Sequence, residues 1–211
     1  MNSQKPSGKK DHWEDIYRTR DHKQVGWYQA LPEISLQLLE KIHARPEQSL
    51  IDVGCGVSTL VDHLIAKGFK KITLLDLSEQ ALATIKDRLA DRADIPVYLS
   101  LDVGRDELGG QYDIWHDRAV FHFLTEASGR QRYMESLGKT LAPDGHAIIG
   151  TFSLDGPNAC SGLDVVQYDE EKMRGELPAG LEIIDTLIHV HIMPSGGEQE
   201  YMYFIIRHKA G

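Results

Sequence analysis

The chain has 211 residues, which suits one domain with a core large enough to fold without disulfides. Its formal net charge is −9, from 32 acidic and 23 scattered basic side chains, which argues against nucleic acid as a partner. Only two cysteines occur and no segment has the apolar length of a membrane span, so we expect a soluble, cytoplasmic protein without a membrane partner.

The first 47 residues are expected to precede and cover the main part of the fold. Residues 1–10 are rich in Ser, Lys, Gly and Pro and are predicted to be a disordered N-terminal tip. Residues 11–211 are then a single domain, in which residues 11–47 form a helical lid or cap. A helix in this cap is predicted from apolar residues at helical spacing after Pro32, which are Ile34, Leu38, Leu39 and Ile42.

Short apolar runs alternate with helical patterns along the rest of the chain. This alternation predicts an α/β fold in which parallel strands are joined by right-handed crossover helices. The last two runs are joined by a hairpin-length link around Pro194, so that pair must be antiparallel, and the final run is apolar on both faces, as in an interior strand. The seven expected strands are residues 49–53, 72–75, 97–101, 112–115, 147–152, 181–192 and 200–207.

Residues that directly follow the first three strands carry the chemistry of a nucleotide site. Open parallel sheets bind ligands beyond the carboxyl ends of their strands. Gly54 and Gly56 follow the first strand and allow the backbone to approach a ligand closely. Asp76, after the second strand, can accept hydrogen bonds from both hydroxyls of a ribose. Asp102, after the third, can either accept from the amino group of adenine or cap its own loop. Together they predict a pocket for adenosine.

These motifs carry a family resemblance. The chain resembles the class I S-adenosylmethionine-dependent methyltransferases in the run Asp52-Val53-Gly54-Cys55-Gly56 and in the acids after the next two strands. It also has Thr59 at the place where a dinucleotide-binding loop has a third glycine. The resemblance implies a Rossmann-like three-layer sandwich with a mostly parallel seven-stranded sheet, in the order 3-2-1-4-5-7-6, and an antiparallel last strand. The residues expected to hold the cofactor are Asp52, Gly54, Cys55, Gly56, Asp76, Leu77, Asp102 and Val103.

The resemblance also implies a reaction and a cofactor. The cofactor is S-adenosyl-L-methionine, the product is S-adenosyl-L-homocysteine, and a methyl group moves to a nitrogen, sulfur or oxygen acceptor. Residues 12–17 and 25–28 are similar to a subgroup that includes protein-lysine methyltransferases, in which this segment covers the cofactor. The fourth-strand motif of that subgroup reads Asp-Lys-Gly-Thr, whereas this chain reads Asp117-Arg118-Ala119-Val120. The acceptor therefore stays open between a protein side chain and a small metabolite.

Methyl transfer from a sulfonium requires alignment and the exclusion of water, and it needs no metal. An acceptor hydroxyl or protonated amine would also need a base. His122 is the best-placed base by sequence, and the alternative is a histidine that packs against a helix. Asp117 can orient the acceptor or contact the methionine end of the cofactor, and we favour the second interpretation.

Four aromatic side chains lie in the N-terminal cap. Trp27 and Tyr28, in a predicted loop, are interpreted as a lid over the substrate. Trp13 and Tyr17 are four residues apart on one helical face and are expected to pack in the core.

The histidine pair and the second cysteine have plain interpretations. His189 and His191 share one face of a strand, but no third ligand is nearby, so we expect surface residues and no metal site. Cys160 has no basic neighbour in sequence and is interpreted as packing or as a pocket wall.

Two other classes of function remain open from sequence. An NAD-dependent oxidoreductase of Rossmann type uses the same kind of loop, but the missing third glycine and the terminal hairpin oppose it. A non-catalytic S-adenosylmethionine-binding module would have the same pocket without turnover. Because the apolar final strand is used inside the sheet and leaves no obvious dimer stripe, we expect a monomer.

Overall fold

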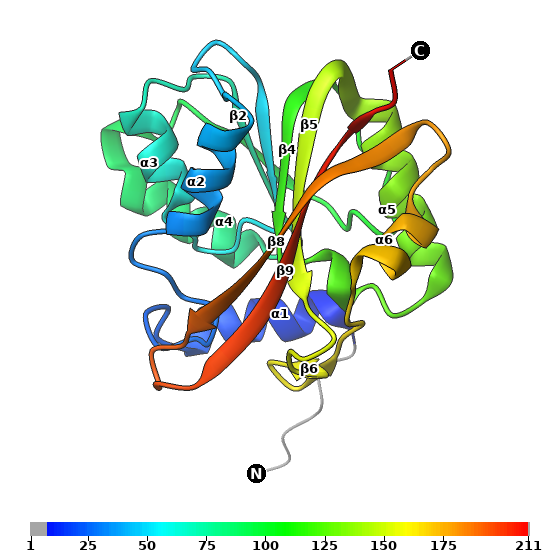
Figure 1. The fold of residues 1–211 in the computed structure, drawn as a ribbon. Coiled ribbons are helices and arrows are strands. Elements are labelled where there is room, and N and C mark those ends of the chain that lie inside the picture. Colours follow the sequence, from blue (N-terminus) through cyan, green and yellow to red (C-terminus); the bar gives the residue numbers. More distant parts are fainter. Residues whose placement is uncertain (1–7, 211) are drawn as a thin grey trace.

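The computed structural model describes residues 8–210, which contain one seven-stranded sheet with helices on both faces (Figure 1). The strand order is β3-β2-β1-β4-β5-β9-β8, in which the first five strands are parallel and β9 runs antiparallel between β5 and β8. This confirms the Rossmann-like sandwich and the expected strand order. The strands of this sheet are β1 (Leu50–Val53), β2 (Ile72–Asp76), β3 (Val97–Ser100), β4 (Tyr112–Arg118), β5 (Leu141–Phe152), β8 (Leu181–Ile192) and β9 (Glu198–His208).

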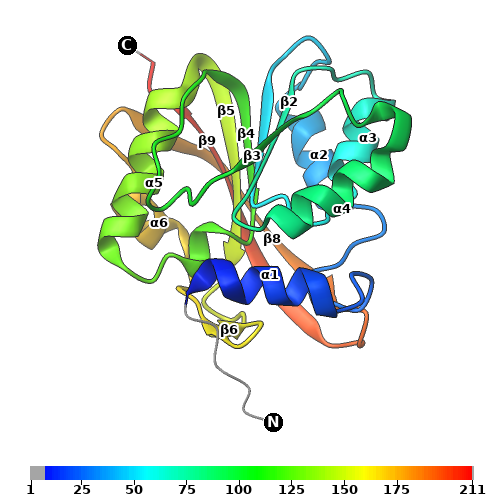
Figure 2. The ribbon, with the colours of Figure 1, turned by 180° about the vertical axis from the view of Figure 1, so that it is seen from behind.

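Two layers of helices cover the sheet. Helices α2, α3 and α4 lie on one face, where Leu38 and Ile85 pack against the strands, and α5 and α6 lie on the other, where Leu137 and Met173 do so (Figures 1 and 2). None of the helices within residues 8–210 combines the length and the hydropathy that crossing a membrane requires. The helices are α1 (Lys9–Thr19), α2 (Glu33–Lys41), α3 (Leu60–Ala66), α4 (Glu79–Leu89), α5 (Ala127–Thr140) and α6 (Glu170–Glu176), with 3₁₀ turns η1 (Ala90–Arg92) and η2 (Phe121–Phe123).

Helix α1 lies across the carboxyl ends of the strands (Figures 1 and 2). Its Glu14 carboxylate accepts hydrogen bonds from the backbone N–H of Glu79 at 2.8 Å and of Gln80 at 3.1 Å, and from the Ser78 hydroxyl at 2.9 Å. The first N–H groups of a helix have no partner inside that helix, so a carboxylate from α1 supplies one for α4. This contact fixes α1 above the strand ends, where ligands of such sheets bind.

Several expected boundaries differ from the structure. The fifth strand was expected at residues 147–152, but β5 already begins at Leu141, which pairs with Tyr112 of β4. Of the expected disordered tip, residues 1–7 lie outside the described residues, but Lys9 and Lys10 already belong to α1. The fourth strand was expected to end at Trp115, yet β4 continues to Arg118. The backbone of β4 pairs with β1 as far as Asp117 and with β5 as far as Arg118, so the strand is extended by these hydrogen bonds although its side chains there are charged.

A small hairpin after β5 was not predicted. It consists of β6 (Ala159–Cys160) and β7 (Leu163–Asp164), which pair antiparallel outside the main sheet. Its residues lie at the same end of the molecule as α1 (Figure 1). The hairpin therefore brings Cys160 to the strand ends.

Candidate cofactor and acceptor site

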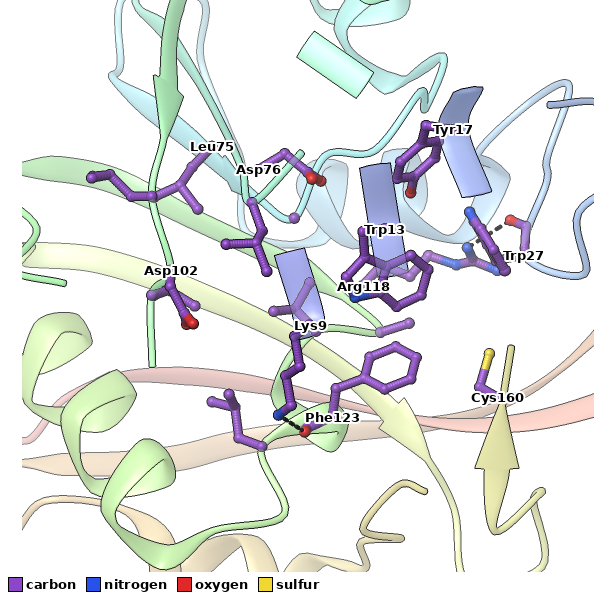
Figure 3. Close-up of a pocket in the computed structure, with 17 residues that line it drawn as sticks. Lys9, Trp13, Tyr17, Trp27, Leu75, Asp76, Asp102, Arg118, Phe123 and Cys160 are labelled. Carbon is purple, nitrogen blue, oxygen red and sulfur yellow. Dashed lines mark hydrogen bonds between the residues drawn. The ribbon is translucent and has the colours of Figure 1, made fainter. Parts of the chain in front are cut away.

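Two adjoining pockets lie at the carboxyl ends of the parallel strands. The strand-end pocket is lined by Asp76, the last residue of β2, by Asp102, which follows β3, and by residues of α1 (Figure 3). The glycine-loop pocket is lined by residues 54–58, the loop after β1. Four residues line both pockets, so the two pockets adjoin one another. These shared residues are Tyr17, Trp27, Gly54 and Arg118.

The structure brings most of the expected cofactor residues to these two pockets. Within the strand-end pocket are Gly54, Asp76, Leu77, Asp102 and Val103. Around the glycine-loop pocket are Asp52, Gly54, Cys55 and Gly56. Asp117 and His122 line neither pocket.

The loop after β1 requires glycine at two positions. Gly54 has a φ of +63° and Gly56 a φ of +51°, in the left-handed region where L side chains are strained. A Cβ on Gly54 would lie 1.9 Å from Cγ2 of Val120, and a Cβ on Gly56 would lie 2.5 Å from the hydroxyl of Tyr17. The backbone of the loop thus packs directly against Val120 and Tyr17, and a side chain at either glycine would force these neighbours to move.

Asp76 ties the glycine loop to the end of β2. Its two carboxylate oxygens accept hydrogen bonds from the backbone N–H of Gly56 and of Ser78, each at 2.8 Å. Burial raises the pKa of Asp76 to about 6, although these two hydrogen bonds oppose the shift. Each carboxylate oxygen accepts one of these bonds and keeps a further lone pair, which is what a ribose diol would need.

Asp102 both caps its loop and lines the pocket. Its Oδ1 accepts from the backbone N–H of Gly104 at 3.0 Å, so the two alternatives considered from sequence are compatible. Lys9 lines the same pocket, and its Nζ donates to the carbonyl of Phe123 at 2.7 Å. Sequence reasoning missed Lys9 because it was assigned to the disordered tip. Its partial burial lowers its pKa, and Asp102 opposes this shift.

Asp52 is part of a buried chain of three polar side chains. Its Oδ1 lies 2.7 Å from Nδ1 of His116, and Nε2 of His116 lies 2.9 Å from Oγ of Ser35. When the neutral imidazole donates from Nδ1 to the carboxylate, Nε2 accepts from the serine hydroxyl. All three residues line the glycine-loop pocket. His116 and Ser35 were not predicted, because only the fold brings α2 and β4 together there.

Asp117 differs from the expectation. We favoured a contact with the methionine end of the cofactor, but its carboxylate is fully buried and accepts from Val120 N at 2.9 Å, Phe121 N at 3.0 Å and the Tyr133 hydroxyl at 2.6 Å. Burial raises its pKa to about 6. Because β4 extends to Arg118 and successive side chains alternate between faces, Asp117 points away from the pockets and Arg118 lines them. Asp117 therefore stabilises the turn after β4.

His122 lies outside both pockets. It is fully buried, and its Nδ1 accepts from the backbone N–H of Phe152 at 3.2 Å. Burial, and then the charge of Arg118, lower its pKa to about 3. This geometry corresponds to the alternative of a neutral, packed histidine, and we do not assign it as a base.

Aromatic rings of the N-terminal cap form one wall of the strand-end pocket. The centroid of Trp13 lies 5.7 Å from that of Trp27 and 5.2 Å from that of Phe123, and Tyr17 lies 6.5 Å from Trp27. Trp13 and Tyr17 were expected to pack in the core, and they do contact other rings, but both also line the pocket. Tyr28 lines the glycine-loop pocket.

Cys160 and the histidine pair complete the comparison with the sequence. Cys160 lines the strand-end pocket, and burial raises the pKa of its thiol to about 11. The thiol is therefore uncharged at physiological pH. His191 was expected at the surface, but it is buried and its Nε2 bonds the carbonyl of Gly26 at 2.8 Å. No group of three His, Cys, Asp or Glu side chains that could hold a metal ion occurs within residues 8–210.

The chain is similar to known methyltransferases in sequence. Residues 51–147 match a family model described as a methyltransferase domain. The eEF1A lysine and N-terminal methyltransferase of Bos taurus is 31% identical over 105 residues, which are 50% of this chain and 15% of that protein. The chain thus matches only a small part of the length of this relative.

Solved structures are similar over nearly the whole chain. A SAM-dependent methyltransferase from Anabaena variabilis has a TM-score of 0.75 at 19% identity and covers 98% of both chains. The N-methyltransferase NodS from Bradyrhizobium japonicum, in complex with S-adenosyl-L-homocysteine, has a TM-score of 0.71 at 15% identity, over 94% of this chain and 99% of that one. The chain therefore shares the fold of S-adenosylmethionine-dependent methyltransferases, and its residues 51–147 match a methyltransferase domain.

Proposed function

We propose that this chain binds S-adenosylmethionine across both pockets and transfers its methyl group to an acceptor at their junction. The observation that carries the proposal is Asp76, which lines the strand-end pocket while it accepts from the backbone of the glycine loop at Gly56. We assign the ribose to Asp76 and the adenine to Asp102 and Val103. The methionine end is assigned to the glycine-loop pocket, beside Asp52.

The residues at the junction align the reactants and exclude water. When bound, the cofactor supplies a methyl group on a sulfonium, and the transfer breaks the S–CH₃ bond, leaves the electron pair on sulfur and forms one bond to the acceptor atom. The aromatic faces of Trp13, Trp27 and Phe123 exclude water and favour a cation in front of them. They thereby supply the desolvated setting that this displacement needs.

Neither Tyr17 nor Cys160, which both line the strand-end pocket, is suited to remove a proton from the acceptor. Burial raises the pKa of Tyr17 well above its usual value and that of the Cys160 thiol to about 11, so both are protonated at neutral pH. We therefore propose that the acceptor atom is nucleophilic before it binds, as in a neutral amine, a thiolate or a carboxylate.

We further propose that the chain acts as a cytoplasmic monomer without a nucleic-acid or membrane partner. Its negative net charge supports the absence of nucleic acid. The edge strand β8 exposes Ile184, Ile188, Val190 and Ile192, an apolar row that the sequence did not lead us to expect. The same strand carries Glu182 and Asp185, and charges on an edge disfavour pairing between copies. Sedimentation equilibrium tests this: a dimer would contradict it.

Incorporation of labelled methyl groups tests the proposed activity. Purified protein is incubated with methyl-labelled S-adenosylmethionine and a cell extract, and the products are separated by size. We expect label in the macromolecular fraction for a protein acceptor or in the filtrate for a metabolite, and none with Asp76→Ala. Tight cofactor binding without incorporation in any fraction would indicate a binding module instead of an enzyme.

A further inference from the structure

Arg118 is a partly buried cation without an acidic partner. Its guanidinium forms no ion pair with any residue from 8 to 210. Nη1 donates to the carbonyl of Trp27 at 2.9 Å, Nε donates to the hydroxyl of Tyr203 at 3.3 Å, and Cζ lies 4.9 Å from the ring centroid of Tyr201. Nη2 is buried and has no hydrogen-bond partner in the described part of the chain. A buried charge is costly unless an opposite charge compensates it.

The charge of Arg118 affects the pKa values of two neighbouring histidines. Burial is the largest cause of the lowered pKa of His122 and of His191, and the charge of Arg118 is the next largest for both. Burial lowers the pKa of Arg118 itself, and the Tyr201 and Tyr203 hydroxyls and the Cys160 thiol more than offset this; none of these groups is a carboxylate. The fold therefore keeps a positive potential here without neutralising it.

Arg118 lies where the two pockets meet. It lines both of them, and it extends toward Trp27 on the side away from Asp102, with Cys160 beyond (Figure 3). With the cofactor spanning both pockets, the sulfonium belongs at this junction and the acceptor must reach it there. A negative group on the acceptor would thus meet Arg118 while its reactive atom lies beside the methyl group.

The methionine carboxylate of the cofactor has other donors available. The glycine-loop pocket is also lined by His22, Gln29 and Ser58. Nδ1 of His22 is buried without a partner in the described residues, so it is free to bond a ligand oxygen. The carboxylate of the cofactor can therefore be bound without Arg118.

We propose that Arg118 binds the carboxylate of the acceptor, and that the acceptor is a small organic acid with an aromatic or apolar body. This inference rests on the proposed function and names its substrate class. The rings of Trp13, Trp27 and Phe123 match such a body. A lysine side chain, whether charged or neutral, offers no anionic group to pair with Arg118.

Calorimetry on the protein saturated with S-adenosyl-L-homocysteine tests the proposal with simple probes. Benzoate, benzamide and benzylamine share a ring and differ in charge. We expect benzoate to bind at least about tenfold more tightly than either of the others, because a charge-assisted bond to a guanidinium is the stronger kind. Equal affinities, tighter binding of benzylamine, or no benzoate binding at about 20 mM would overturn the proposal.

Variants separate the acceptor from the cofactor. Arg118→Gln should remove the preference for benzoate and change the affinity for S-adenosyl-L-homocysteine by less than about threefold. Arg118→Lys should retain part of the preference. Arg207→Gln, on the same sheet but paired with Glu182 at the surface, should change neither. If Arg118→Gln loses much of its affinity for S-adenosyl-L-homocysteine but keeps the preference for benzoate, Arg118 belongs to the cofactor site.

The controls distinguish the two levels of failure. If Arg118→Gln does not fold, the comparison of the three probes on the wild-type protein still decides the proposal. If the wild-type protein does not bind S-adenosyl-L-homocysteine, the proposed function fails. If it binds this product but does not prefer benzoate, only the assignment of Arg118 fails.

Discussion

Single glycines decide whether the loop after β1 can receive a ligand. We predict that Gly54→Ala lowers the free energy of unfolding by more than the roughly 1–2 kcal/mol that a left-handed backbone costs a non-glycine residue. The reason is the additional clash with Val120, 1.9 Å from the new Cβ. S-adenosyl-L-homocysteine binding, measured by calorimetry, should be lost.

Gly162 provides a matched control for this substitution. Its φ is +80°, but no atom lies within 4 Å of the position of a Cβ. Gly162→Ala should therefore show the backbone strain alone in thermal or denaturant unfolding and keep its affinity for the product. Equal losses of unfolding free energy in Gly54→Ala and Gly162→Ala would contradict the steric argument.

Asp76 carries the assignment of the ribose. We predict that Asp76→Asn weakens S-adenosyl-L-homocysteine binding by about tenfold to a hundredfold, because hydrogen bonds to charged groups contribute roughly 1.5–3 kcal/mol. The amide keeps one acceptor oxygen and turns an N–H₂ group toward a backbone donor or the ribose. Asp91→Asn, an exposed position at η1, should bind normally. Normal binding by Asp76→Asn would show that the ribose lies elsewhere.

The pH dependence of binding follows from the same carboxyl group. Burial raises the pKa of Asp76 from 3.8 to about 6, so the group becomes neutral as the pH falls below that value. A neutral acid loses acceptor capacity toward Gly56 and the ribose. We predict an affinity for S-adenosyl-L-homocysteine that is constant above about pH 7 and decreases below about pH 6. In Asp76→Asn, calorimetry should find no such decrease, and its persistence would point to another group.

At the scale of elements, the attachment of α1 to α4 positions one wall of the pocket. Glu14 of α1 accepts three hydrogen bonds at the start of α4. Helix α1 also carries Trp13 and Tyr17, which line the strand-end pocket. We predict that Glu14→Gln lowers the free energy of unfolding by about 1–2 kcal/mol, as loss of a helix cap does, and weakens product binding. Asp15→Asn, which breaks only an exposed pair with Arg18, should cost less than about 0.5 kcal/mol and leave binding unchanged. Similar effects of both variants would contradict a specific role for Glu14.

The sequence predicted elements better than it predicted their ends and the direction of side chains. The acids after β2 and β3 could be predicted because each directly follows an apolar run. The end of β4 could not, since its last residues are charged and are held in the strand by pairing with two neighbours that are distant in sequence. The misplaced end of β4 explains why Asp117 was assigned to the cofactor and Arg118 was not assigned at all.

At the scale of the whole molecule, alternation of strands and helices fixed the parallel sheet, and the terminal hairpin fixed its antiparallel end. The buried chain of Asp52, His116 and Ser35 could not be predicted, because its members come from three elements and only Asp52 belongs to a sequence motif. The same holds for the contact between α1 and α4. Sequence patterns thus indicated the residues that we assign to the cofactor, whereas Arg118, which we assign to the acceptor, became apparent only in the assembled fold.

Calorimetric titration of the wild-type protein with S-adenosyl-L-homocysteine and, separately, with NAD⁺ tests the central claim most directly. The two pockets meet at Gly54 and contain no third glycine for a pyrophosphate. We predict one binding site for S-adenosyl-L-homocysteine, with a dissociation constant of about 100 μM or tighter, and no binding of NAD⁺ at about 1 mM. Binding of NAD⁺ without binding of S-adenosyl-L-homocysteine would contradict the account.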